Sequence, residues 1–245
     1  MRLYGIAVSL SILGSLGGLI TASVFLLLGD GLRVKLVPWL ISYAVGTLLG
    51  VALLALVPEA LTALKPVPVM ATLLAGVLAF FLLEKLVLWR HCHDTHECEV
   101  HTSSAASLVI VGDALHTFVD GAVIAAAVVT SVPLGITTAL AVAAHEIPQE
   151  VGDVAILLRA GYSRIRAFTL NLLSSAGGIL GALAMIAASR SVPVLMPYVL
   201  AFAAGNFLYV AMADLIPDLH RGGLEGGPIR QLAMIGAGIL TISLL

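Results

Sequence analysis

The chain has 245 residues, of which 60% are hydrophobic and 11% are charged, and its net charge is −2. Because soluble domains carry about 25% charged residues, this composition indicates an integral membrane protein surrounded by membrane lipid. Long unbroken apolar runs exclude a transmembrane β-barrel, whose strands alternate apolar and polar residues. The sequence has no basic stripe with interleaved aromatic residues, so we expect no nucleic-acid partner.

Apolar runs divide the chain into segments long enough to cross a bilayer, which takes about 20 helical residues. They predict an all-α integral membrane protein with eight transmembrane helices, in a single domain over residues 1–245. The predicted spans are residues 4–28, 37–63, 67–89, 105–130, 134–158, 165–189, 194–217 and 229–245.

Lysine and arginine are divided unevenly between the two ends of these spans. Nine of the twelve lie in loops that follow odd-numbered spans, whereas Arg2, Lys65 and Arg190 lie on the other side. Basic loops stay in the cytoplasm. We therefore expect a multi-pass protein of a cell membrane, such as a cell inner membrane, with both termini outside the cytoplasm.

The second and seventh predicted spans share a short motif. The second span ends in LVPEAL at residues 56–61 and the seventh in LIPDLH at residues 215–220, so each places an acid directly after a proline. These two spans run through the membrane in opposite directions. The motif therefore favours an inverted repeat of 3+2+3 helices, with chance as the competing explanation for so short a match.

Metal-binding side chains crowd the loop after the third span, at about residues 90–104. Histidine and cysteine are good ligands for zinc and similar metals, although the spacing here matches no structural zinc finger. We interpret this segment as a flexible cytoplasmic loop that collects metal; the alternative is a loop that is merely polar. The candidate ligands are His91, Cys92, His93, His96, Cys98 and His101.

Five carboxylates fall inside the fourth and fifth predicted spans, where each costs roughly 2.5–3.5 kcal/mol even on a lenient insertion scale. At about 100° per residue, the polar groups of the fourth span fall within about 100° of helix surface, and those of the fifth within roughly 140°. Such groups persist where they line a cavity or hold a cation. The two sets are Asp113, His116, Thr117 and Asp120, and His145, Glu146, Gln149, Glu150 and Asp153.

The strongest candidate ligands in these sets are two imidazoles and two carboxylates. Together they form a mixed nitrogen and oxygen set, which suits zinc and its divalent neighbours better than an oxygen-only cage does. These four residues are His116, Asp120, His145 and Glu146.

Pro148 is expected to shape the site on the fifth span. It has no N–H for the carbonyl of Ala144, so it kinks the helix and frees a carbonyl near the ligands. Broken helices at mid-membrane commonly form ion sites. Gln149 lies one turn from His145 and could add an oxygen.

Further polar groups could border the site. Glu150 and Asp153 lie nearer the cytoplasmic end, where they either extend an exit path or pair with the arginines that follow the span. In the seventh span we expect a buried acid near the cytoplasmic mouth. The secondary candidates are Asp113, Asp153, Asn171, Ser174 and Asp214.

These motifs resemble the ZIP family of divalent-metal transporters. The similar segments are HTFVDG at 116–121, HEIPQEVGD at 145–153, LLEKLVLWRHCH at 82–93 and FLYVAMADLIPDL at 207–219. The resemblance implies transport of divalent metal, most often zinc, toward the cytoplasm. It leaves Cd²⁺, Fe²⁺, Mn²⁺, Co²⁺ and Ni²⁺ as further candidate substrates.

The resemblance also implies two adjacent metal positions. One would be held by His116, His145 and position 149, and the other surrounded by Thr117, Asp120 and Glu146. This chain departs from the family pattern at five positions: Val51 and Ala55 replace ligands of the second helix, Thr117 replaces an asparagine, Gln149 replaces a histidine, and Ser174 stands where some members carry a carboxylate. A site short of one imidazole and one acid should bind more weakly or hold only one metal well.

Two other functions fit part of the pattern. A metal-gated channel or sensor could use the same ligands. HEIPQ also begins like the H-E-x-x-H of zinc proteases, which suggests an intramembrane metallohydrolase, but Gln149 replaces the second histidine and Pro148 interrupts the helix. We therefore expect no enzymatic activity. The sequence leaves the oligomeric state open, with a homodimer as one option.

Overall fold

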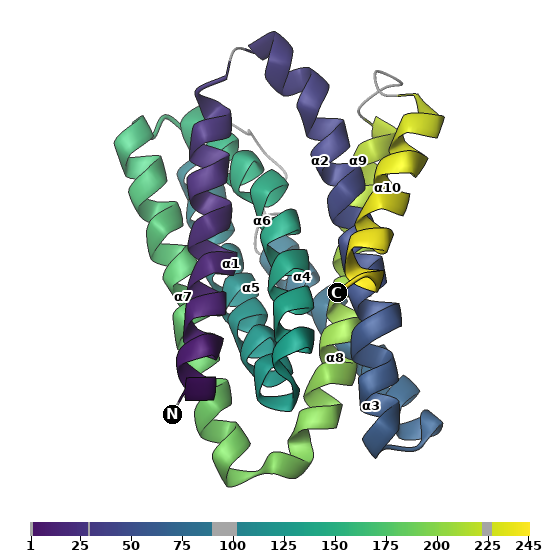
Figure 1. Cartoon of the computed structure of the whole chain (residues 1–245). Coiled ribbons are helices and arrows are strands. Elements are labelled where there is room, and N and C mark those ends of the chain that lie inside the picture. Colours follow the sequence, from purple (N-terminus) through teal and green to yellow (C-terminus); the bar gives the residue numbers. More distant parts are fainter. Residues whose placement is uncertain (1, 29, 90–101, 222–226) are drawn as a thin grey trace.

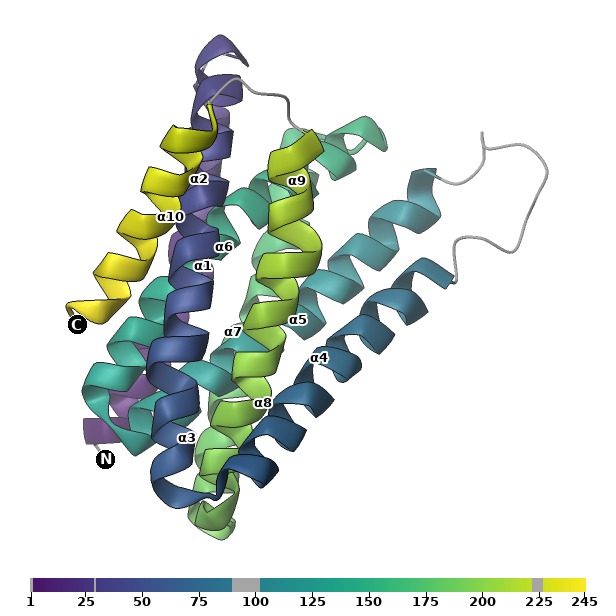
Figure 2. The same cartoon turned by 90° about the vertical axis from the view of Figure 1, so that its right-hand side faces the viewer.

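The computed structural model describes residues 2–28, 30–89, 102–221 and 227–245, and these are almost entirely helical (Figures 1 and 2). The predicted all-α class is confirmed. The helices are α1 (Arg2–Leu26), α2 (Asp30–Gly50), α3 (Val57–Ala63), α4 (Pro66–Trp89), α5 (Thr102–Thr130), α6 (Val132–Arg159), α7 (Arg164–Ser191), α8 (Met196–Tyr209), α9 (Ile216–Arg221) and α10 (Pro228–Ser243). The loop ligands predicted from sequence, His91, Cys92, His93, His96, Cys98 and His101, lie outside the described residues.

In the described part of the chain the helices form eight rods, because α2 runs on into α3 and α8 runs on into α9. Six of the rods are long and apolar enough to cross a membrane by length and composition. The helix α6 is not among these six, because its candidate ligands make it more polar. The helix α10 is not among them because it has only 16 residues. The rods match the predicted spans closely in position.

Two rods contain a wider, π-helical segment that the sequence analysis did not predict. These segments are Val51–Leu56 and Val210–Leu215, and each ends just before a proline of the shared motif. Proline has no N–H to donate, so it interrupts regular helical bonding, and wider turns gather at such interruptions. The matching positions agree with an inverted repeat, which stays a prediction.

The rods pack as two groups; Figure 1 shows α1, α5, α6 and α7 on the left and α2–α3, α8–α9 and α10 on the right, with α4 partly hidden behind α5 and α6. The first group contains α1, α5, α6 and α7, and the second contains α2–α3, α4, α8–α9 and α10. The groups meet mainly where α2 packs on α6 and where α5 faces α8.

The helices α5 and α7 approach each other closely at a pair of glycines. A Cβ atom on Gly121 would overlap the main chain of Gly178, so only glycine fits there. Small residues allow membrane helices to pack at such short range. Gly121 directly follows Asp120, and this contact therefore helps to set the position of the polar face of α5.

Candidate metal centre

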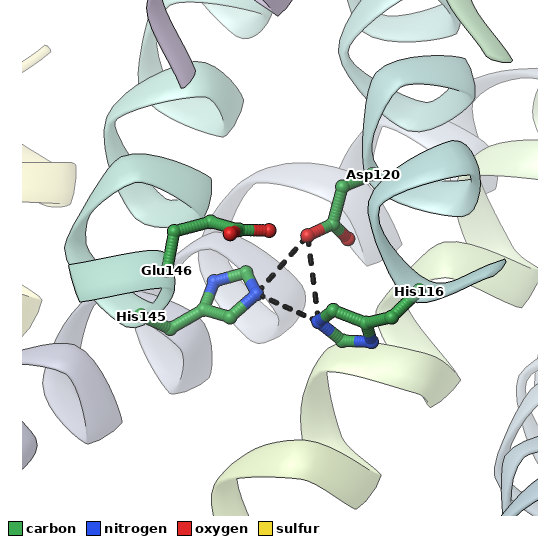
Figure 3. A group of neighbouring side chains, drawn as sticks. All are labelled: His116, Asp120, His145 and Glu146. Carbon is green, nitrogen blue, oxygen red and sulfur yellow. Dashed lines mark hydrogen bonds and ion pairs between the residues drawn. The ribbon is translucent and has the colours of Figure 1, made fainter. Parts of the chain in front are cut away.

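The helices α5 and α6 bring two histidines and two acids to one point inside the first group of helices (Figure 3). The Nε2 atoms of His116 and His145 lie 3.2 Å apart. Oδ2 of Asp120 lies 3.1 Å from Nε2 of His145 and 3.5 Å from Nε2 of His116. One ligand atom from each of these residues and from Glu146 lies within 4.8 Å of all the others.

These separations fit a tetrahedral metal site. Zinc bonds nitrogen at about 2.0–2.1 Å, and a tetrahedron with such bonds separates its ligand atoms by about 3.3–3.4 Å. The three measured distances, 3.1, 3.2 and 3.5 Å, bracket that value. The arrangement needs only small movements to close around one ion.

A hydrogen bond to the main chain orients one of the imidazoles. Nδ1 of His145 lies 3.0 Å from the carbonyl oxygen of Ala141, one turn earlier on α6. An N–H at Nδ1 donates to that carbonyl, which leaves the Nε2 lone pair facing the cluster. Partners of this kind fix both the tautomer and the ring direction of histidine ligands.

All four residues are buried, with at most 9% of the surface of each residue exposed. Both carboxylate oxygens of Glu146 lack a hydrogen-bond partner among the described residues, and Figure 3 shows them turned toward Asp120. Among those residues, neither acid lies within ion-pair distance of a lysine or arginine. Buried carboxylates without a counter-charge are costly, so this donor set is suited to a cation.

A second group of acids lies beside the first and shares Glu146 with it. One ligand atom each from Asp113, Glu146 and Glu150 lies within 4.8 Å of the others. The α7 hydroxyls of Ser174 and Ser175 reach this group, the first donating to Asp113 and the second to Glu150 at 2.9 Å. Sequence analysis placed Asp113, Glu150 and Ser174 at the border of the site and did not predict that three helices would bring them together.

A cavity of about 530 Å³ connects the site with one end of the protein. Beyond His116 it runs between α4, α5, α6 and α8–α9, toward the carboxyl-terminal ends of α4, α6 and α9. Its acidic lining residues are Glu84, Asp113, Asp153, Asp214 and Asp218. On the other side of the site the helices are closed by packed apolar side chains, among them Val123, Ile124, Ala127 and Val142.

The structure also shows where Gln149, Thr117 and Asp214, three other predicted site residues, lie. Gln149 lies in the cavity wall. The hydroxyl of Thr117 donates to the main-chain oxygen of Asp113 at 2.7 Å. The expectation that Asp214 is buried is wrong, because its side chain is exposed where it lines the cavity.

Comparison with known proteins gives the family. Residues 89–245 match the family described as "ZIP Zinc transporter". Zinc transporter ZIP13 of Pongo abelii is 34% identical over 236 residues, which cover 89% of this chain and 70% of that protein. The chain belongs to the ZIP zinc transporter family. This confirms the family predicted from the sequence.

Other relatives agree with this assignment. Zinc transporter ZIP13 of Homo sapiens is 30% identical over 273 residues, covering 89% of this chain and 74% of that protein. Zinc transporter ZIP10 of Homo sapiens is 36% identical over 155 residues, which cover 61% of this chain and only 19% of that much longer protein. ZIP proteins are transporters and not enzymes, so the expectation of no enzymatic activity is confirmed and the metallohydrolase alternative is set aside.

In this ZIP chain, Gly18 of α1 is a neighbour of the site that sequence analysis did not identify. A Cβ atom at Gly18 would lie 2.7 Å from Cβ of Glu146. The first predicted span contains several glycines, and the sequence does not show which of them faces α6. The contact makes Gly18 a residue that positions Glu146.

Proposed function

We propose that this ZIP protein carries zinc across a cell membrane into the cytoplasm, and that four side chains bind the ion on the way. The single observation that carries the proposal is the spacing of three of their ligand atoms, which is that of a tetrahedral zinc site. The two carboxylates supply two negative charges, and these balance the two positive charges of zinc. The proposed ligands are His116, Asp120, His145 and Glu146.

The cavity supports a direction of travel. It connects His116 with the end of the protein that the distribution of lysine and arginine assigns to the cytoplasm. Acidic lining residues lower the electrostatic energy of a departing cation. Zinc would therefore leave through this cavity, and both termini would lie on the opposite side of the membrane, where zinc arrives.

A carrier fits the site better than a channel does. Of the four ligands, His116 lines the cavity, whereas packed apolar side chains such as Ile124 and Val142 close the other side. Zinc that arrives from that side requires the helices to rearrange around a mid-membrane site. A channel would be open to both sides at once.

Several finer points belong to the same proposal. Zinc is the substrate named for the family, and Cd²⁺, Fe²⁺, Mn²⁺, Co²⁺ and Ni²⁺ are further candidates because their ions accept similar nitrogen and oxygen ligands. A homodimer and a location in a cell inner membrane stay predictions. Gln149 would serve at most as an additional oxygen ligand from the cavity wall.

Uptake of zinc into liposomes that contain the purified protein tests the proposal. We expect Asp120→Ala and His145→Ala each to abolish uptake, because each removes an atom that lies 3.1 Å from its neighbouring ligand. The matched control is His220→Ala, which removes an exposed histidine at the end of α9. Uptake by both site variants at the rate of the control would refute the assignment.

The same assay separates a carrier from a channel. A carrier saturates as external zinc increases, because each ion must bind the site before it crosses. Flux that rises in proportion to zinc without saturating would favour the channel instead.

A further inference from the structure

A second cavity, well separated in character from the acidic one, lies between α4, α5, α7 and α8. We call it the lateral groove; Thr72 of α4, Ala122 of α5, Met185 of α7 and Phe202 of α8 mark its four walls. Its volume is about 360 Å³, none of the described residues that line it is charged, and the surface turned toward it is entirely apolar. Such a lining offers nothing to a metal ion and suits an apolar ligand.

The lateral groove opens on the surface of the protein. Phe118, Leu195 and Tyr198 line it, and their exposed fractions are 38%, 44% and 37%. All four helices that form its walls are among the six that are long and apolar enough to cross a membrane. In a membrane transporter, exposed surface on such helices faces lipid, so the groove opens toward the bilayer.

The groove occupies one end of the membrane-spanning helices. Thr72 lies in the second turn of α4, Tyr198 in the first turn of α8 and Met185 in the last two turns of α7. The acidic cavity runs toward the opposite end, where α4 and α9 terminate. From Leu195 to Phe202 the groove follows roughly 10 Å of helix, which fits within one leaflet, or about half of the 30 Å hydrocarbon core.

The groove also lies between the two groups of helices. Its walls α5 and α7 belong to the first group, whereas α4 and α8 belong to the second. On α5 it is lined by Val119, which directly precedes the proposed ligand Asp120, and by Val123, one of the apolar residues that close that side of the site. A molecule bound in the groove therefore contacts both groups and lies behind the closed side of the metal centre.

The surroundings of the groove favour an acyl chain as its occupant. Water does not fill cavities that are wholly apolar, and an empty groove deprives its lining of dispersion contacts. Lipid tails are the apolar molecules that surround a membrane protein. The volume of about 360 Å³ lies within the range of about 300–1,000 Å³ typical of small-molecule sites.

A helix of a second copy of the chain fits this groove less well. Such a helix would need a continuous face along the hydrocarbon core of about 30 Å, and the groove extends over only about a third of that length. Tyr198 supplies a further indication, because tyrosine is enriched where membrane and water meet. The headgroup would lie near Tyr198, with the acyl chain directed inward past Phe202 toward Phe118.

We propose that the lateral groove binds one acyl chain of a membrane phospholipid, in the half of the bilayer opposite the acidic cavity. The bound chain fills the space between the two groups of helices. Since the lining carries no charge, the groove recognises the chain and not a particular headgroup.

Photo-crosslinking tests the proposal. The purified chain is placed, without zinc, in phosphatidylcholine vesicles that contain a phosphatidylcholine with a diazirine on one acyl chain, and labelled residues are located by mass spectrometry. We expect label on Phe202 in the groove and on Leu173, a residue of α7 that is 69% exposed and does not line the groove. Ala122→Leu places a bulky side chain in the groove and should reduce the label on Phe202 at least threefold, with the label on Leu173 unchanged.

The matched control is Ala184→Leu, which adds the same side chain to an exposed position of α7 and should leave both labels unchanged. If Ala122→Leu does not fold, Val199→Phe fills the groove from the side of α8 and should have the same effect. A second copy is tested with Val199→Cys in a chain that carries Cys92→Ser and Cys98→Ser. We expect oxidation to leave that variant monomeric.

The proposal is overturned if Leu173 is labelled and Phe202 is not, or if Phe202 is labelled equally in Ala122→Leu and Ala184→Leu. It is also overturned if Val199→Cys forms disulfide-linked dimers, since that result places a second copy over the groove. Because labelling is measured without zinc, a protein that fails to move zinc but is labelled as expected would refute only the proposed function.

Discussion

Substitution of Gly18 tests whether α1 holds Glu146 in place. In Gly18→Ala the new Cβ atom would lie 2.7 Å from Cβ of Glu146, whereas carbon atoms in favourable contact lie about 3.5–4.0 Å apart. Cβ of Glu146 is attached directly to the main chain of α6, so a change of rotamer cannot move it away. The two helices must separate by roughly 1 Å.

The size of the effect follows from that overlap. Overpacking by one methyl group costs about 1–3 kcal/mol. If α6 moves to relieve the overlap, the ligands are displaced and zinc binding loses a similar amount of free energy. A loss of about 1.4 kcal/mol corresponds to a factor of ten in affinity. We therefore expect Gly18→Ala to weaken zinc binding about 5- to 150-fold, although it changes no ligand and no charge.

The neighbouring glycine provides a matched control. A Cβ atom at Gly17 meets nothing within 4 Å, so Gly17→Ala adds the same methyl group to the same helix without touching α6. Zinc affinity is measured by calorimetry, and uptake into liposomes is measured in parallel. If Gly18→Ala binds zinc as tightly as Gly17→Ala does, α1 does not position Glu146 and the reasoning fails.

Two further predictions address the ligands and the helix packing. Zinc uptake should fall as the pH on the side of zinc arrival is lowered through about 6, because imidazole binds metal only when neutral and its ordinary pKa is about 6.5; rates that stay flat from about pH 7.5 to 5.5 would contradict imidazole ligation. Gly121→Ala should lower the melting temperature of the protein, because its methyl group would overlap the main chain of Gly178 and overpacking costs about 1–3 kcal/mol. The control for that variant is Gly236→Ala, whose Cβ meets nothing within 4 Å, and equal melting temperatures would show that α5 and α7 can separate without loss.

The sequence determined the helices and the chemistry that they carry. Apolar runs specify membrane helices because unpaired main-chain groups are costly in lipid. Along one helix, residues three, four and seven apart share a face, so His116 and Asp120 could be placed together without a structure, as could His145 and Gln149. Carboxylates inside these runs also indicated a functional site, because inserting a carboxylate into the membrane costs free energy unless it lines a cavity or holds a cation.

Only the tertiary structure decided how those faces meet. The spacing of residues along α6 fixes neither the rotation nor the depth of α6 against α5, which depend on packing such as that of Gly135 of α6 against Val128 of α5. The separation of 3.2 Å between His116 and His145 therefore could not be read from the sequence. The helix packing also brought Glu146 against Gly18.

The same reason explains what sequence analysis placed incorrectly or left open. Asp214 was expected to be buried because it lies in an apolar run, but the packing of α8–α9 leaves it exposed to the cavity. Glu150 could have extended a path or met an arginine, and its hydrogen bond to Ser175 of α7 places it inside the protein. Helix periodicity decides which residues are neighbours within one helix, whereas contacts between helices depend on side-chain packing across the whole bundle.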